Sequence, residues 1–373
     1  MENQLIYLKA ISDLLKWSTY KKNSIIHDIL FTYKLTFEEF FGLSLSKMKD
    51  VFKLTEHDFL ALKDICAQIP AIALEIESLY RQGIEIIAHN DIAYSDSLKR
   101  KMKGNAPTLL YVKGDKALLN KKTIAVVGSR DVSEKGIIFT KNISKRCAKN
   151  NYVISSGYAR GVDKIALDTV LNYGGKSIAV IPQGILTFKN ELKKLATQIA
   201  DGKLLIVSAF PPFAQWAGFR ALERNKYIYC LAESIFVSES RNKGGSWSGA
   251  KEGLRTGQKV FVRYAELEEG CANNKLIALG AKAVDMYGDE LKYVNIPPEG
   301  EALFLAKLPQ IIHLLSDRAM NANQLIAMFK LDISGNLLIR RLKDVPYVNW
   351  RIRNGCLYFY FGRISKYEQI SLI

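Results

Sequence analysis

Thr123-Ile-Ala-Val-Val-Gly-Ser-Arg130 is the stretch that decides the fold of this 373-residue chain. Residues 123–127 are small or β-branched, which suits a buried strand, and Gly128 ends the run at a turn. A helical pattern follows over residues 134–150, and Ser133 is placed to cap its first turn. A short apolar strand followed by a helix is the repeating unit of a parallel α/β sheet.

The same alternation of strand and helix continues along the chain. We predict five more strands, at residues 152–155, 177–181, 204–207, 235–238 and 260–262. The helices expected between them cover residues 161–172, 189–200, 224–232 and 246–256. Continuous apolar strands that alternate with helices of about a dozen residues indicate a parallel sheet covered on both faces. The sequence therefore predicts an α/β fold with a Rossmann-like parallel sheet core over residues 91–296.

Two further zones flank this core. Residues 1–90 carry apolar side chains at helical spacing, beginning with Leu5, Leu8 and Ile11, and are predicted to form a helical N-terminal domain. Pro297-Pro-Glu-Gly300 is expected to be a linker. Beyond it, residues 301–373 show three helical segments and then two strand patterns around Asn354-Gly355. That layout predicts a winged-helix-like C-terminal domain.

The chain is strongly basic, with 53 Lys and Arg against 37 Asp and Glu and a net charge of +16. Such an excess favours a polyanionic partner or an acidic membrane surface, although a Lys-rich surface can also reflect the base composition of the host. In residues 301–373, ten Lys and Arg against five Asp and Glu give a net charge of +5. Contact with DNA and contact with another protein are both open for this zone.

Several classes of protein are excluded by what the sequence lacks. No run of roughly 18 apolar residues occurs, so we expect no membrane span, and residues 1–10 lack the pattern of a signal peptide. The five cysteines are scattered without a CxxC pair, and the four histidines lie far apart. These features predict a cytoplasmic protein with no disulfide framework, no metal site and no cofactor.

The residues that follow each strand matter most, because ligands of open α/β sheets bind beyond the carboxyl ends of the strands. Gly and Ser recur there, as Gly128-Ser129, Ser156-Gly157 and Gly244-Gly245-Ser246. Glycine lets a backbone approach a ligand closely, and helix N-termini present free N–H groups to anions. Arg130 and Arg160 can each place a guanidinium on phosphate oxygens. Each residue alone can be purely structural, but their recurrence at successive strand ends predicts a phosphate-binding surface.

The common catalytic motifs are missing from the sequence. It has no G-x-x-x-x-G-K-[ST] loop, no G-x-G-x-x-G after the first strand and no G-x-S-x-G elbow. Asp163 and Glu239 follow strands and are the candidates for a general base. A carboxylate such as Asp163 at a helix start is also explained by capping. We therefore expect a binding protein rather than an enzyme.

Motifs spread over nearly the whole chain resemble those of the bacterial DNA-processing protein A family (DprA, also called Smf). Residues 124–130 resemble its G-S-R signature, and Ser156-Gly-Tyr-Ala-Arg-Gly-Val-Asp163 resembles its S-G-x-A-x-G-I-D. Asn190 matches the Asn of its Y-P-x-x-N-x-x-L, and Arg224-Asn-Lys226 stands where the family has R-N-R. Gly245-Ser246 matches part of a later block.

The resemblance implies single-stranded DNA binding by the core, loading of the RecA recombinase, and a role in natural transformation or related recombination. Together with Arg160, which the strand-end argument supplies, the residues predicted to bind DNA phosphates are Gly128, Ser129, Arg130, Ser156, Gly157, Asn190, Arg224, Lys226, Gly245 and Ser246. We also expect a homodimer.

The chain departs from the family pattern at several positions, for example at Leu167, where the family usually has His, and at Ala209, where it has Glu. A nucleotide-ligand sensor or a phosphoribohydrolase-like enzyme is therefore the alternative, in a role such as defence against foreign DNA. Enzymes of that second type carry P-G-G-x-G-T-x-x-E. Residues 244–252 are similar to this motif but lack its Pro and Thr, and Glu252 is displaced by one position.

Overall fold

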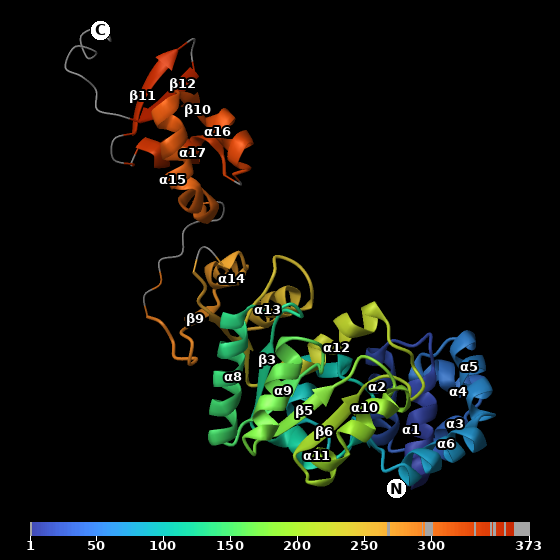
Figure 1. Ribbon diagram of the computed structural model, residues 1–373. Coiled ribbons are helices and arrows are strands. Elements are labelled where there is room, and N and C mark those ends of the chain that lie inside the picture. The colour runs from blue at the N-terminus through green and yellow to red at the C-terminus, as the bar shows by residue number, and fades with distance from the viewer. Residues whose placement is uncertain are drawn as a thin grey trace, which may run out of the picture. The chain divides into compact units, whose positions relative to one another are not determined.

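The computed structural model describes residues 2–266, 269–292, 294, 301–331, 333–343, 345, 348–353 and 356–361. The chain divides into two compact units, Met1–Arg263 with Ala281–Glu290, and Tyr264–Gly280 with Leu291–Ile373. Their helices and strands are labelled in Figure 1. The division into three domains at residues 90 and 296 stays a prediction.

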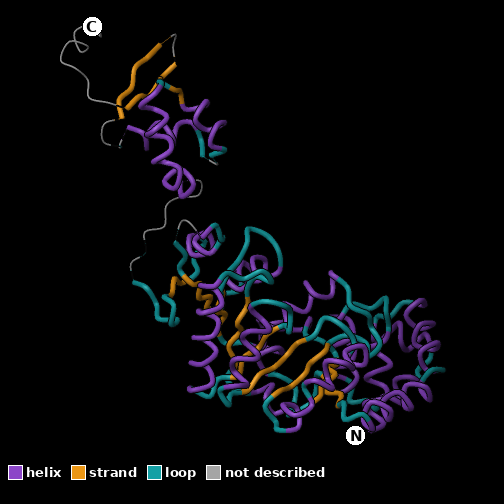
Figure 2. The backbone as a smooth tube through the Cα atoms, in the orientation of Figure 1, coloured by secondary structure: helices purple, strands orange, loops and turns teal. Residues whose placement is uncertain are grey.

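A nine-stranded sheet forms the centre of the first unit, in the order β1-β2-β6-β5-β4-β3-β7-β8-β9. Figure 2 draws its strands in orange between purple helices. Strands β3 to β9 are parallel, whereas β2 runs opposite to its neighbours β1 and β6. The strands are β1 Glu85–Ala88, β2 Leu109–Lys113, β3 Thr123–Val127, β4 Val153–Ser156, β5 Lys176–Val180, β6 Leu204–Ser208, β7 Ser234–Val237, β8 Lys259–Arg263 and β9 Lys282–Val284. The predicted α/β fold with its parallel sheet is confirmed.

All six predicted strands form, because each is a continuous apolar run; β4, β5 and β6 are buried on both faces, whereas Phe236 of β7 and Phe261 of β8 are only partly buried. The prediction missed β1, β2 and β9. Strand β9 has only three residues, and β1 and β2 pair antiparallel at one edge of the sheet. These edge strands lie outside the strand–helix alternation on which the prediction rested.

Helices connect the parallel strands at nearly the predicted positions. They are α8 Glu134–Lys149, α9 Val162–Asn172, α10 Lys189–Lys194, α11 Ala196–Ala200, α12 Gly218–Leu231 and α13 Gly245–Arg255. The helix predicted over residues 189–200 is interrupted at Leu195. Helix α12 begins six residues before the predicted start at residue 224. The sequence did not indicate this first part, because Phe219 and Leu222 there are more than half exposed and contribute no buried apolar stripe.

The N-terminal helices, blue in Figure 1, share one hydrophobic core with the sheet. Ile11 of the first helix is buried in the same cluster as Tyr111 of β2 and Ile206 of β6. The helices are α1 Glu2–Asp13, α2 Thr19–His27, α3 Phe37–Phe41, α4 Leu45–Phe52, α5 Glu56–Cys66 and α6 Ile69–Arg81, and α7 Asp96–Met102 follows β1. A second cluster packs α8 and α9 on β3 and β4 through Phe139, Val162 and Ile154.

The second unit has its own hydrophobic core, which includes Phe304, Leu325, Leu338 and Phe359. Its larger helices are α15 Glu301–Asp317, α16 Ala322–Phe329 and α17 Gly335–Lys343, and the short α14 Asn273–Ala278 precedes them. Strands β10 Met320–Asn321, β11 Val348–Arg353 and β12 Cys356–Phe361 form an antiparallel sheet in the order β10-β12-β11. Three helices and a strand pair therefore form as expected, while the winged-helix assignment stays a prediction.

Two predicted features, the linker at residues 297–300 and the turn at residues 354–355, lie outside the described residues. In the part of the chain that the structure describes, no helix combines the length and the apolar character needed to cross a membrane.

Asp58 joins the helices of the N-terminal zone through a buried network. Its carboxylate accepts hydrogen bonds from Trp17 Nε1 at 2.7 Å, from Lys21 Nζ at 2.6 Å and from the Thr55 backbone and hydroxyl at 2.9 and 2.7 Å. Burial by itself raises the pKa of this carboxyl, but the hydrogen bonds from Lys21 and Thr55 outweigh it and hold the pKa at about 2. Asp58 therefore stabilises the folded state in its ionised form.

We expect Asp58→Asn to lower the free energy of unfolding at neutral pH by about 2 kcal/mol, because the folded pKa lies below the unfolded value of about 3.8. The contribution of an acid with a lowered pKa is present above its unfolded pKa and is lost as the pH falls toward the folded pKa. The gap between wild type and variant should therefore narrow by roughly 1 kcal/mol at pH about 3. Urea unfolding followed by circular dichroism measures both values, and the exposed Asp64→Asn on the same helix is the control. A gap that does not change with pH would contradict this account of Asp58.

Candidate functional site

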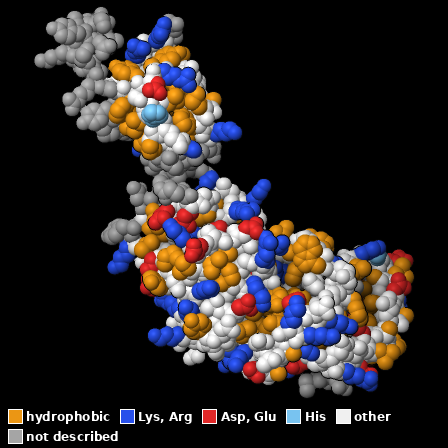
Figure 3. Space-filling view, viewed as in Figure 1, with side chains coloured by type: hydrophobic (Ala, Val, Ile, Leu, Met, Phe, Trp, Pro, Cys, Tyr) orange, Lys and Arg blue, Asp and Glu red, His pale blue; other side chains and the backbone are white. Residues whose placement is uncertain are grey.

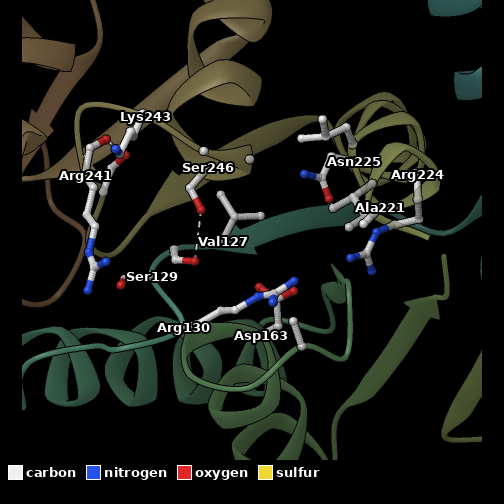
Figure 4. Close-up of a pocket in the computed structure, with 18 of the residues that line it drawn as sticks. Val127, Ser129, Arg130, Asp163, Ala221, Arg224, Asn225, Arg241, Lys243 and Ser246 are labelled. Carbon is white, nitrogen blue, oxygen red and sulfur yellow. Dashed lines mark hydrogen bonds between the residues drawn. The ribbon is translucent and has the colours of Figure 1, made fainter. Parts of the chain in front are cut away.

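The connections of the sheet diverge at β3, which lies between β4 and β7. Strands β4, β5 and β6 continue to one side, and β7, β8 and β9 continue to the other. Such a reversal opens a crevice beyond the carboxyl ends of the two central strands. A cavity of about 400 Å³ lies there, lined by the loops after β3 and β7 and by one side of α12 (Figure 4).

The loop after β3 fits tightly against its neighbours. A Cβ on Gly128 would lie 2.6 Å from Val162 Cγ2 and 3.0 Å from the Glu239 carbonyl oxygen, so only glycine fits at this position. The Ser129 amide donates to the same Glu239 oxygen at 2.8 Å, and the Ser246 hydroxyl donates to the Gly128 carbonyl at 2.9 Å. These bonds connect the ends of β3 and β7 to the start of α13, and they fix the backbone that forms one wall of the cavity.

Arg224 on α12 forms the buried floor of the cavity and is only 4% exposed. Its Nη1 donates to the carbonyl oxygens of Gly157 and Val180, each at 2.5 Å. Within the described residues its Nε atom is buried without a hydrogen-bond partner. Asp163, which accepts a hydrogen bond from the Gly157 amide at 3.1 Å, supplies the negative charge nearby.

Burial and charge act in opposite directions on this pair. Burial raises the pKa of the Asp163 carboxyl, and the positive charge of Arg224 opposes that rise. Burial also lowers the pKa of the Arg224 guanidinium, and Asp163 opposes that change. Both sequence candidates for a general base thus have structural partners, since Glu239 accepts hydrogen bonds from the Ser133 amide and hydroxyl at the start of α8.

Cations from separate loops surround the mouth of the cavity. Figure 4 shows Arg241 and Lys243 on the loop before α13, and Arg130 on the loop after β3. Arg130 is exposed and has no ion-pair partner among the described residues. Asp131 lies between two further guanidinium groups: one carboxylate oxygen pairs with Arg160, and the other lies 3.2 Å from Arg241 Nη2.

Exposed aromatic side chains continue from the cavity over the start of α12. Trp216 lines the cavity and is 55% exposed, while Phe213 and Phe219 are 66% and 65% exposed. Arg220 lies over the Phe219 ring at 4.9 Å from its centre. Large exposed rings beside a cation-rimmed cavity are suited to stack on planar ligand groups.

The structure brings about half of the predicted site residues together at the cavity. Those that line it are Gly128, Ser129, Arg130, Arg224, Gly245 and Ser246. Ser156 is buried with its hydroxyl on the Val126 carbonyl, Gly157 lies behind Arg224, and Arg160 pairs with Asp131. Asn190 is an exposed residue of α10, and Lys226 is an exposed residue of α12 that does not line the cavity.

Sequence reasoning missed Asp131, Trp216, Arg241 and Lys243 as lining residues. Arg241 and Lys243 follow β7 directly, so the rule applied to the other strand ends could have found them. Trp216 gave no signal, because the segment before α12 has no regular pattern. Among the described residues, no group of three or more His, Cys, Asp or Glu side chains is arranged to hold a metal ion.

We expect Gly157→Ala to destabilise the protein by about 3 kcal/mol, because a Cβ there would overlap Arg224 Nη1, which two carbonyls hold in place. In an Arg224→Gln background the shorter side chain removes the overlap with Nη1, whereas the approach to Asp163 Oδ2 at 2.6 Å remains, so the same substitution should cost less, by about 1 kcal/mol. Urea unfolding of the four proteins in this double-mutant cycle measures the coupling. Gly218→Ala is the control, since a Cβ there meets no atom within 4 Å. Equal costs of Gly157→Ala in the two backgrounds would contradict the proposed contact.

Comparison with known proteins agrees with this geometry. The family model for DNA recombination-mediator protein A matches residues 85–295. The DNA processing protein DprA of Streptococcus pneumoniae is 33% identical over 191 residues, which cover 50% of this chain and 67% of that protein. The DNA processing protein DprA of Bacillus subtilis is 31% identical over 234 residues, which cover 58% of this chain and 78% of that protein.

A solved structure supports the same relation. The X-ray structure of DNA processing protein A from Streptococcus pneumoniae superimposes with a TM-score of 0.62 at 26% identity, over 76% of this chain and 94% of that chain. The matched residues 85–295 contain the cavity and every strand of the large sheet. The resemblance expected from the motifs is confirmed, and this chain belongs to the DNA recombination-mediator protein A family.

Proposed function

We propose that this chain binds single-stranded DNA at the cavity between β3 and β7 and acts as a recombination mediator in DNA uptake. One observation carries the proposal: Arg130, Arg241 and Lys243 come from loops after two adjacent strands and surround one cavity at the switch point of the sheet. Arg224 lines the same cavity, and its buried Nε has no hydrogen-bond partner among the described residues. Clustered cations with free donors are what a phosphate backbone requires.

The position of these cations matters more than their number. On the face of the first unit that Figure 3 shows, Lys and Arg side chains are spread among Asp and Glu side chains rather than gathered in one patch. The net charge of +16 therefore indicates a polyanionic partner without locating its site. At the cavity the start of α13 adds the N–H groups of its first turn, which favour an anion.

The shape and the aromatic border favour a single strand. A cavity of about 400 Å³ has the size of pockets that hold small ligands, so it suits one nucleotide of a chain rather than a duplex. Trp216 and Phe219 lie exposed beside it, where unpaired bases can stack. In a duplex the faces of the bases are already stacked and unavailable to these rings.

The nucleotide-hydrolase alternative gains no support from this geometry. Glu252, the counterpart of that motif's glutamate, is bonded to Arg255 Nε at 2.8 Å and Nη2 at 2.6 Å. It is exposed on α13 and does not line the cavity. The remaining parts of the proposal are a RecA recombinase partner and a homodimer. Membership of the recombination-mediator family supports the first of these parts.

We expect the double variant Arg130→Gln with Lys243→Gln to weaken binding of a labelled oligothymidine about tenfold. The slope of log K against log salt concentration should become shallower by roughly 1.4, because each of the two lost cations accounts for about 0.7 of it. Trp216→Ala should weaken binding while leaving that slope unchanged, because stacking releases no counterions. Fluorescence anisotropy over a salt series measures both effects. The control is Lys226→Gln with Lys251→Gln, which removes two exposed charges of α12 and α13 outside the cavity. Binding by wild type that is absent or insensitive to salt, or an equal loss in the control, would refute the proposal.

Asp131→Asn should strengthen binding of the same oligothymidine about three- to tenfold and steepen its salt dependence, because it frees Arg160 and Arg241 for phosphate. The control is Asp168→Asn on α9, which makes the same change of charge at a half-buried ion pair with Lys164 that does not line the cavity. It should change the affinity less than twofold. The same anisotropy titration decides the point. Weaker binding by Asp131→Asn would mean that this carboxylate orients the two arginines for DNA instead of competing with it.

A further inference from the structure

The outer face of the β11–β12 strand pair in the second unit is basic and aromatic. The register sets Arg351 opposite Tyr358 and Arg353 opposite Cys356. Arg351 also lies over the Tyr360 ring, with its Cζ 5.8 Å from the ring centre. A hollow of about 380 Å³ opens at this face and is lined by Arg351, Arg353, Tyr358 and Ala319.

A third cation, from helix α17, lies against the inner face of the same strand pair. Trp350 is opposite Phe359, which is completely buried in the core of the unit, so side chains on this face point toward the helices. The core covers them incompletely, since Trp350 is 45% exposed and Ile352 is 72% exposed. Lys343, at the end of α17, places its Nζ 5.1 Å from the centre of the Trp350 ring. Cations therefore lie on both sides of the strand pair, which β10 extends at Tyr358 and Phe359 and which is two-stranded at residues 352–353 and 356–357.

These charges are not neutralised within the described part of the unit. Neither arginine nor Lys343 forms an ion pair with a carboxylate there. Asp317 is the sole acidic residue between positions 301 and 361 whose side chain is described. Unpaired cations on exposed strands indicate a polyanionic ligand.

We propose that the β11–β12 strand pair inserts into a groove of double-stranded DNA, as a binding site separate from the cavity of the first unit. The major groove is about 12 Å wide and admits a two-stranded β-ribbon, and phosphates line both of its walls. Arg351 and Arg353 contact one wall, and Lys343 contacts the other. A single strand has one backbone and would engage only one face of the ribbon. Trp350 and Ile352 add exposed apolar surface on the Lys343 side of the strand pair.

The test uses the full chain, a fluorescein-labelled DNA duplex of mixed sequence and an oligothymidine of the same length. Arg351→Gln with Arg353→Gln should weaken duplex binding about tenfold and lower its salt dependence by roughly 1.8, from two cations at about 0.9 each. Lys343→Gln should lower the slope by roughly 0.9. Oligothymidine binding should change less than twofold in all of them. Oligothymidine binding reports on the cavity site, and duplex binding reports on the strand pair. Failure of the proposed function would therefore appear in the first measurement, and failure of this inference in the second.

The matched control is Lys307→Gln with Lys330→Gln, which removes two charges of α15 and of the residue after α16 that do not line the hollow, and it should leave duplex binding within about twofold of wild type. An equal loss in this control, unchanged duplex binding in both ribbon variants, or a parallel loss of oligothymidine binding would overturn the proposal. Thermal melting by circular dichroism checks that each variant folds. If a Gln variant melts early, Arg351→Lys with Arg353→Lys keeps the charge and must retain duplex binding, and its failure to do so would also overturn the proposal.

Discussion

The buried guanidinium of Arg224 is the interaction on which the carboxyl edge of the sheet depends. It donates to the carbonyl of Gly157 after β4 and to that of Val180 at the end of β5, while its own helix, α12, leads into β7. A buried cation is costly unless it is paired and hydrogen-bonded, and Asp163 provides the compensating charge. Gly157 is required because a larger residue would displace the guanidinium. The motif at residues 156–163 and the motif at residues 224–226 are thus parts of one structural unit, although they are more than sixty residues apart in the sequence.

The sequence predicted the strands well because residues buried on both faces of a parallel sheet must be continuously apolar. It could not show which strands are neighbours, and the site depends on that order: β3 lies between β4 and β7 although β7 comes much later in the chain. The strand-end rule located Gly128, Ser129 and Ser246 correctly at the cavity.

Helix geometry explains why other predicted residues lie elsewhere. Helix α12 borders the cavity along one side, which includes Leu222, Arg224 and Asn225, and the next residue, Lys226, lies just outside that side because successive helix residues are turned by about 100°. Family motifs record residues in a line and do not distinguish a side chain that contacts ligand from one that supports the backbone. Ser156 illustrates the second kind, since its hydroxyl is bonded to the Val126 carbonyl and is fully buried. Arg241 and Lys243 illustrate the opposite error, because they line the cavity without belonging to a recognised motif.

Two DNA sites on one chain would have a consequence that neither has alone. When one site is occupied, the other meets the same DNA molecule at the high effective concentration set by covalent linkage, so binding at both sites exceeds either affinity without any new contact. The two proposed sites differ in what they take: the cavity suits an unpaired nucleotide, and the β11–β12 ribbon suits a duplex groove. DNA that carries both a single strand and a duplex can occupy both sites, whereas DNA of one kind occupies only one. Even if each site binds DNA weakly, the two sites together can therefore select a DNA molecule that contains both a single strand and a duplex.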